Sequence, residues 1–466
     1  MYNLTAAHIV GITITLIGIT IIGIYSGKNI KSSSDFSGGA RRAGAPIIAG
    51  TIMGTLVGGS STVGTAQLAF LYGFSAWWFT LGAGIGLLIM ALFFVKPLYN
   101  TKNETVSEIL MSEFGNAAGL FSSIFVSIGM FLNIIGQVLA AIALLMSIFK
   151  IAPLIAAVIS IILMASYVCF GGVWGTGIVG IAKLFLLYIA VMYGGYLALS
   201  YGGGISSYIN TFPLYPYFSL FGRGFWIDFA AGFSLVIGVL TTQTYVQAVL
   251  SGKSLRESVK GSLISAFFIP PIGLAGIFIG LYMKMNYPDL NPASAFPEFV
   301  IRHMNPLFGG IVLATLLITV VGTAAGLSLG ISTLLAKDIY KNYIDKHAED
   351  DKFLKVSRIM ILFVLALTLF FISGNIKSLI QKWSYMSMGL RGATAFGPLC
   401  AALFLKGKVN KNLAIGAMFF GPLSMLLVKP FLPENFDPLY VGVAVNFLLV
   451  MIGWILGNDK KSIAHE

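Results

Sequence analysis

Charged residues are scarce in this sequence, and acidic residues are the scarcer kind. Charged residues make up 10% of the chain, against roughly a quarter of a typical soluble domain, while 57% of the residues are hydrophobic. A water-soluble surface cannot be built from this mixture. Long hydrophilic stretches are also missing, because the longest, 337–356, has only about twenty residues. We therefore expect no appended soluble domain.

Cysteine and histidine are equally sparse. Cys169 and Cys400 both lie inside apolar runs, so we expect buried thiols rather than a disulfide framework or a metal site. The four histidines lie at the ends of apolar runs, between them or in the tail, and none is placed for a proton relay in mid-membrane. Nucleophile motifs and phosphate-binding glycine loops are absent from the sequence. We predict neither an enzyme nor a bound organic cofactor.

What the sequence has in abundance is apolar runs of about 20 residues, each long enough to cross a bilayer. They predict an all-α membrane protein in which residues 1–466 form one transmembrane domain of about thirteen helices. The first run has no basic stretch before it and no small-residue cleavage site after it, so we interpret it as a retained span. The predicted spans are 7–25, 45–65, 75–95, 118–149, 151–170, 174–200, 225–250, 261–283, 308–336, 358–373, 379–405, 413–431 and 438–457.

The basic residues predict an orientation. If the N-terminus lies outside, the inner loops hold twenty Lys and Arg residues and the outer loops hold seven. This bias is typical of multi-pass proteins of the plasma (inner) membrane, here with the C-terminus in the cytoplasm. The net charge of +12 is then a topology signal rather than a sign of nucleic-acid binding. The expected partners are the lipid bilayer and a small molecule, and no protein partner is implied.

Two of the predicted spans contain patterns that interrupt a helix. The second holds Gly58-Gly59-Ser60-Ser61, and the seventh holds Gly238 followed by Thr241-Thr242-Gln243-Thr244. Unwound backbone inside a membrane is tolerated where it lines a cavity, and there it exposes groups that bind ions and solutes. The two spans are five apart, which suits two five-helix inverted repeats, spans 2–6 and 7–11, with broken first helices. The alternative is that these glycines serve close helix packing.

Motifs along most of the chain resemble the sodium:solute symporter family. Each motif is loose, but their order and spacing together are fairly specific. They are Ser34-Asp35-Phe36 with Arg41-Arg42, Thr105-Val106-Ser107-Glu108, Gly171-Gly172, Gln243 with Gln247, Asn291-Pro292-Ala293, and the run from Gly322-Thr323 to Asp338-Ile339-Tyr340. The resemblance implies a five-plus-five helix core and sodium-coupled solute uptake by alternating access.

The resemblance also implies a sodium site between the first and eighth core helices. Matching by spacing places backbone carbonyls at Gly54, Val57 and Thr319, and side-chain hydroxyls at positions 322 and 323. Thr323 supplies a hydroxyl, but Gly322 supplies none. The predicted site is therefore one ligand short of the family pattern.

A second departure lies at the same predicted depth. The family usually has Asp where this chain has Gly180, and Gln where it has Lys183. Lys183 lies about 13 Å into its span at 1.5 Å per residue, which matches the depth of Gly54. One hypothesis is that the ammonium replaces the sodium ion, which would make transport proton-coupled or uncoupled. In the competing interpretations Lys183 reaches the cytoplasmic surface, or water supplies the missing sodium ligand.

Arg391 is predicted near the middle of a span, and the spans contain no carboxylate at that depth. An unpaired buried guanidinium is costly and suits a negatively charged ligand, which favours an organic acid or amino acid as the solute. Alternatively, Arg391 holds the broken helices in place. The other candidate solute-binding residues are Ser60, Ser61, Gln67, Gln243 and Tyr245, and they leave a neutral solute open. The competing functions are a non-transporting membrane sensor and a channel.

Overall fold

The structure is a computed structural model that describes residues 4–27, 41–103, 105–336, 340 and 350–457, without the side chains of 20, 22–27, 167–182, 333 and 350–354. The described residues are almost entirely helical, and their one extended pairing is the bridge between Ala43 and Gly252. This confirms an all-α protein. The predicted motif residues Ser34, Asp35, Phe36, Asp338 and Ile339 lie outside the described residues.

The second predicted span is broken, as expected. Helix α3 (Ala45–Leu56) ends where Val57 turns to an extended conformation, and α4 begins six residues later (Val63–Tyr72). Gly58 lies in this break, where there is little room for a side chain. An added Cβ would stand 2.7 Å from Gln137 Oε1 and 3.0 Å from Thr323 Oγ1. Two helices, α8 (Asn116–Phe149) and α16 (Pro306–Leu334), therefore close in on the unwound backbone.

The seventh predicted span is also broken. Helix α12 (Phe225–Thr241) meets α13 (Gln243–Leu250) at an angle of 46°, and Thr242 is the extended residue between them. Thr241 and Thr242 turn their hydroxyls back onto the carbonyls of Ile237 and Gly238, at 2.9 and 2.5 Å. The two threonine hydroxyls thus hydrogen-bond carbonyls in the last turn of α12.

The other helices follow the predicted spans with two differences. The predicted spans 151–170 and 174–200 were wrong as separate helices, because both lie in one helix, α9 (Pro153–Tyr201), in which the paired glycines at 171–172 do not end the helix. The predicted span 75–95 is a chain of short pieces, η1 (Gly73–Trp77), α5 (Trp78–Ile89) and η2 (Met90–Phe94), continued by α6 (Val95–Thr101).

The remaining helices enclose the two broken ones. They are α1 (Ala6–Gly27), α7 (Val106–Phe114), α8 (Asn116–Phe149), α10 (Gly204–Thr211), α11 (Leu214–Tyr217), α14 (Leu255–Asn286), η3 (Pro292–Ser294), α15 (Ala295–His303), α16 (Pro306–Leu334), α17 (Asp350–Ser373), α18 (Ile380–Phe404), α19 (Lys411–Leu427), η5 (Lys429–Phe431) and α20 (Leu439–Leu456).

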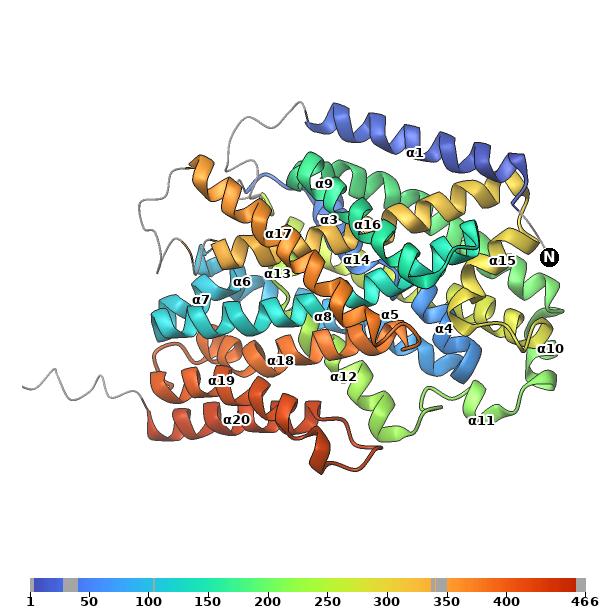
Figure 1. Cartoon of the computed structure of the whole chain (residues 1–466). Coiled ribbons are helices and arrows are strands. Elements are labelled where there is room, and N and C mark those ends of the chain that lie inside the picture. Colours follow the sequence, from blue (N-terminus) through green and yellow to red (C-terminus); the bar gives the residue numbers. More distant parts are fainter. Residues whose placement is uncertain (1–3, 28–40, 104, 337–339, 341–349, 458–466) are drawn as a thin grey trace, which may run out of the picture.

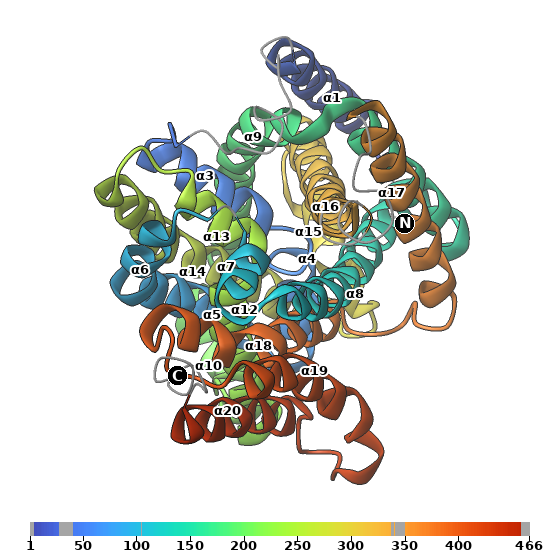
Figure 2. The same ribbon diagram turned by 90° about the vertical axis from the view of Figure 1, so that its left-hand side faces the viewer.

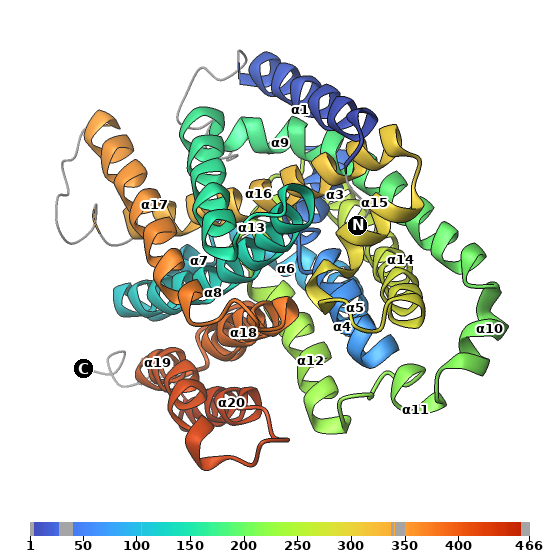
Figure 3. The ribbon, with the colours of Figure 1, turned by 45° about the vertical axis from the view of Figure 1, so that its right-hand side comes forward.

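The long helices run side by side as one bundle (Figure 1). Helix α18 packs against both α8 and α12, while α1 lies at one edge on α16 and α9, and α19 with α20 forms the opposite edge (Figure 2). The short helices α10 and α11 pass along one end of the bundle to reach α12 (Figure 3). The start of α1 and the end of α20 lie at opposite ends of the bundle (Figure 1).

Among the described residues, seven helices are long and apolar enough to cross a membrane, or eight if α12 and α13 form one span. Four shorter apolar helices, among them α3 and α19, add to these. The chain is a multi-pass membrane protein. The count of thirteen spans and the inverted repeats stay predictions.

Candidate functional site

The first break is held by an uncharged side chain of α8. Gln137 accepts a hydrogen bond from the Gly59 amide through Oε1 at 2.7 Å, and its Nε2 donates to Asn133 Oδ1 at 2.9 Å. Both side chains are buried, at 2% and 6% exposure. An unpaired amide at this depth would cost about 1–3 kcal/mol, so Gln137 makes the broken backbone tolerable.

Helix α18 holds the first break from the other side. Ser60 and Ser384 share a hydrogen bond of 2.6 Å between their hydroxyls. Gln381 donates from Nε2 to the Ser60 carbonyl at 3.2 Å and to the Thr65 hydroxyl at 2.9 Å. Its Oε1 accepts from the Tyr385 hydroxyl at 3.1 Å. The first break is therefore enclosed by amides and hydroxyls.

The second break is held by a charged group on the same helix. Arg391 is fully buried and donates from Nη1 to Thr242 Oγ1 at 2.8 Å. Its Nε donates to the Ser387 carbonyl at 3.1 Å, and Nη2 donates to the Ser387 hydroxyl at 2.8 Å. Because Thr242 is the residue between α12 and α13, the guanidinium clamps the bend itself.

One face of α18 thus contacts both breaks. Gln381, Ser384, Met388 and Arg391 are spaced by three or four residues, so they lie along one side of the helix. The first two contact the first break, and Arg391 contacts the second. A group that binds between the breaks would lie against this face.

The structure separates the six predicted solute-binding residues. Ser60 and Ser61 both lie in the first break, where Ser61 bonds the Gly58 carbonyl, and Arg391 contacts the second break. Gln67 accepts from the Ile380 amide at the start of α18, and Gln243 accepts from the Val106 amide at the start of α7, both at 2.9 Å. Tyr245 is buried at 3% exposure in α13.

Sequence reasoning gave no site role to four polar residues that enclose the first break. None of the four is among the predicted solute-binding or ion-binding residues. The signal was polar side chains at three- or four-residue spacing inside apolar runs. They are Asn133, Gln137, Gln381 and Ser384.

The predicted sodium ligands of α16 lie against the first break. The Thr323 side chain is buried at 2% exposure, and its hydroxyl has no hydrogen-bond partner among the described residues. It faces Gly58, where an added Cβ would stand 3.0 Å away. The neighbouring carbonyl of Thr319, however, accepts a hydrogen bond from Lys183 Nζ at 3.4 Å.

These residues supply fewer free oxygens than the predicted sodium site requires. Gly322 offers no side-chain oxygen, and the Thr319 carbonyl already contacts an ammonium. A sodium ion on the same carbonyl would lie within about 6 Å of Nζ, given ion–oxygen distances near those of calcium. Two unit charges about 6 Å apart repel by about 3 kcal/mol at an effective dielectric constant of about 20.

Lys183 and Arg391 are not paired with acids in the part of the chain that the structure describes. The ion pairs there join Arg223 to Asp228, and both Lys150 and Arg302 to Glu298. Asp228 is fully buried in the first turn of α12 and also accepts from the Ser75 hydroxyl at 2.7 Å. Among the described residues the paired acids therefore lie at the start of α12 and in α15, while the two basic residues near the breaks lack counter-charges.

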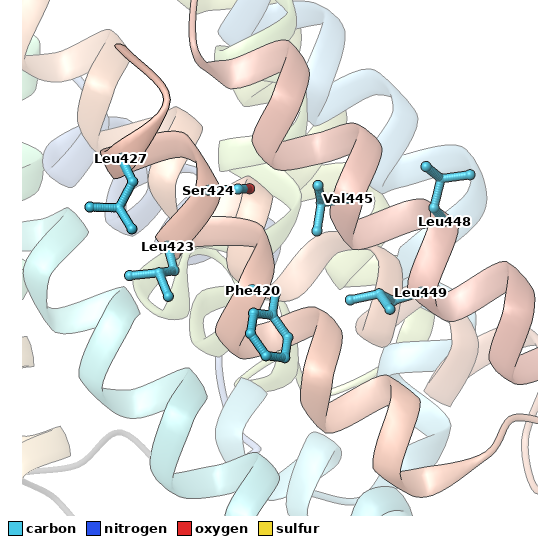
Figure 4. A pocket seen from close by; sticks show the side chains of 7 residues that line it. All are labelled: Phe420, Leu423, Ser424, Leu427, Val445, Leu448 and Leu449. Carbon is cyan, nitrogen blue, oxygen red and sulfur yellow. The ribbon is translucent and has the colours of Figure 1, made fainter. Parts of the chain in front are cut away.

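A surface groove between α19 and α20 holds none of the predicted site residues (Figure 4). Its volume is about 520 Å³, and its lining is apolar except for Ser424, whose hydroxyl donates to the Gly421 carbonyl. A solute carried through water needs polar contacts that this groove does not offer. The breaks remain the better candidates.

The comparisons with known proteins agree with this arrangement. The sequence profile of the sodium:solute symporter family matches residues 36–421, which is most of the chain. The chain belongs to the sodium:solute symporter family. Its members are transporters rather than enzymes, which confirms the predicted class of this symporter-family protein.

Individual relatives are distant. A sodium/proline symporter of Haemophilus influenzae is 22% identical, over 96% of this chain and 94% of its own. The high affinity choline transporter 1 of Homo sapiens is 22% identical, over 86% and 73%. A solved sodium-coupled sialic acid symporter has a TM-score of 0.78 at 17% identity, over 97% and 98%. At that identity the structural likeness supports the fold alone.

Proposed function

We propose that this chain is a secondary active transporter that moves a small, carboxylate-bearing organic solute by alternating access. The observation that carries the proposal is the single face of α18 that contacts both breaks. In transporters with broken helices, the solute binds at such interruptions near mid-membrane. The uncharged contacts of Ser60, Gln381 and Ser384 are of a kind that a solute can exchange for its own hydrogen bonds.

The carboxylate is inferred from uncompensated charge. Arg391 is fully buried, and among the described residues no acid pairs with it or with Lys183. Placing a basic residue in mid-membrane costs about 3 kcal/mol, and an anionic group would offset part of that cost. Two of the three relatives described above are named for proline and sialic acid, both of which carry a carboxylate.

Sodium is the first candidate for the coupling ion because the family supports it. The proposed ligands are the carbonyls of Gly54, Val57 and Thr319 and the hydroxyl of Thr323, with no contribution from the Gly322 side chain. The alternative is a proton-coupled or uncoupled transporter. For orientation we propose that α1 begins outside and α20 ends in the cytoplasm, as the charge of the loops predicts.

Uptake by purified protein in sealed liposomes tests the function. A panel of radiolabelled amino acids and monocarboxylates is offered with an inward sodium gradient, an inward proton gradient or neither. We expect saturable accumulation of at least one carboxylate, inhibited by its own unlabelled form but not by its methyl ester. Binding without uptake across the panel would instead favour the non-transporting sensor.

A further inference from the structure

We propose that the ammonium of Lys183 is a tethered cation that takes the place predicted for sodium at the first break. The inference rests on the proposed function, since it concerns the ion site of that transporter. It assigns to one side chain a charge that other members of the family would take from solution.

The position of Lys183 carries the first step. Its helix, α9, packs against both α3 and α16, the two helices that supply the predicted sodium ligands. The side chain is 4% exposed, which excludes the interpretation in which it reaches the surface. Its Nζ donates to the Thr319 carbonyl, one of the predicted ligands.

Apolar side chains of α1, α9 and α16 lie next to the contact between Lys183 and Thr319. Leu186 lies one turn along α9, and it packs with Ile318 of α16 and Ile19 of α1 in a small apolar cluster. Ile318 directly precedes Thr319, so this cluster lies beside the lysine contact. The contact between Lys183 and the Thr319 carbonyl therefore has apolar side chains beside it.

The chemistry of the neighbouring groups favours a cation. The carbonyls at the C-terminal end of α3, from Gly54 to Val57, lie at the negative end of the helix dipole. The Thr323 hydroxyl, one turn beyond Thr319, is buried and has no partner in the described structure. An ammonium has three donors, and among the described residues the bond to Thr319 uses one of them. Lys183 thus has donors available, and the Thr323 hydroxyl is an unused acceptor one helical turn from its contact with Thr319.

Gly322 fits the same explanation. A hydroxyl at this position would complete the sodium ligands, and its absence weakens the site for a free ion. Its absence costs nothing if a lysine supplies the charge, because the ammonium is already bound covalently to α9. The missing hydroxyl at position 322 and the lysine at position 183 then have a single explanation.

Sodium binding in the absence of solute tests this. Purified protein in detergent is heated with either sodium or potassium chloride at equal ionic strength and constant pH, and binding of radioactive sodium is measured in parallel. A ligand that binds only the folded state raises the melting temperature. We expect no difference between sodium and potassium for the wild type and no specific sodium binding. For Lys183→Ala we expect a sodium-dependent rise of a few degrees and specific binding.

Further variants sharpen the outcome. Lys183→Met keeps the length and apolar stem of the side chain if the alanine variant does not fold, and it should also gain sodium binding. Adding Gly322→Ser to Lys183→Ala should raise sodium affinity further, and adding Thr323→Val should abolish the gain. Lys382→Ala, which removes an exposed lysine of α18, is the matched control and should gain nothing.

Two results would overturn the inference. Sodium stabilisation of the wild type equal to that of Lys183→Ala would mean that the lysine does not occupy the ion position, and the predicted sodium site would stand. Folded Lys183→Ala or Lys183→Met protein that binds no sodium would mean that the lysine is structural only. Neither result depends on solute, so the proposed transport stands or falls separately on the uptake panel.

Discussion

The two breaks differ in length and in the charge of the groups that hold them. The first leaves six residues, 57–62, outside a helix and is enclosed by amides and hydroxyls from α8 and α18. The second leaves Thr242 alone between its helices and is clamped by the guanidinium of Arg391. One helix, α18, contacts both.

This difference indicates a division of roles. Neutral hydrogen bonds of about 1 kcal/mol each can be exchanged singly for bonds to a ligand, so the longer break is suited to rearrangement. A buried guanidinium with several hydrogen bonds is costly to move, so the shorter break is suited to keep its shape. We expect substitutions at the second break to have the larger effects.

Replacing Arg391 by Met is expected to have the largest effect. The change removes the charge that we propose pairs with the solute carboxylate. Losing one side of a buried charge pair costs about 4 kcal/mol, roughly a thousandfold in KM for uptake into liposomes. Arg391→Lys, which keeps the charge but not the fork that reaches both Thr242 and Ser387, should lose less. An Arg391→Met variant that keeps the wild-type KM for the acid would show that Arg391 only holds the break.

Charge also fixes the other end of the second broken helix, where Asp228 pairs with Arg223 at 2.6 Å. We expect Asp228→Asn to lower the free energy of unfolding by about 3 kcal/mol, because it leaves a mostly buried guanidinium without its anion. Thermal unfolding in detergent measures this. The matched change on the first broken helix is Gln67→Leu, which removes an uncharged acceptor and should cost only about 1–2 kcal/mol. Equal losses would contradict the proposed difference between the two helices.

At the first break itself, Gln137→Leu should cost about 2 kcal/mol in unfolding free energy. The change leaves the buried Gly59 amide without an acceptor. Gln137→Glu keeps an acceptor for that amide and is the control, although it adds a charge that favours bound cations. A leucine variant as stable as the wild type would mean that another group can satisfy the Gly59 amide.

The sequence predicted where both helices break but not how they are held. Glycine and threonine runs mark the breaks because local backbone chemistry decides them. The partners Gln137 and Ser384 come from helices far along the chain, and a single sequence carries no sign of which polar residue meets which. The predicted break between 170 and 174 was wrong because the paired glycines there do not end α9.

The site residues show the same limit. Gln67 and Gln243 were chosen as polar residues near the breaks, but each accepts a backbone amide at the start of another helix. Lys183 was predicted at the depth of the first break from its position along a span, and the structure places it against the Thr319 carbonyl. Depth follows from chain length alone, whereas the direction of a side chain depends on packing.

The smallest predicted effect is a gain in stability, and it concerns Asp437 in the loop before α20. Burial raises the pKa of the Asp437 carboxyl, against the opposing influence of the Leu439 amide, Lys429 and Arg223. A raised pKa in the folded state means that the ionised carboxylate weakens folding. The stability contributed by the protonated carboxyl is fully present below the ordinary pKa of 3.8 and is lost as the pH rises through the folded pKa.

Asp437→Asn keeps the oxygen that accepts from the Leu439 amide at 2.9 Å and removes the charge. We therefore expect the variant to melt slightly above the wild type at pH 7.5, with the difference shrinking toward pH 4, while Glu434→Gln in the same loop shows a smaller change. A variant that melts below the wild type at pH 7.5 would mean that the attraction between Asp437 and Arg223 outweighs the cost of burying the carboxylate. The charge of Asp437 would then stabilise the fold, as we expect for the charge of Asp228.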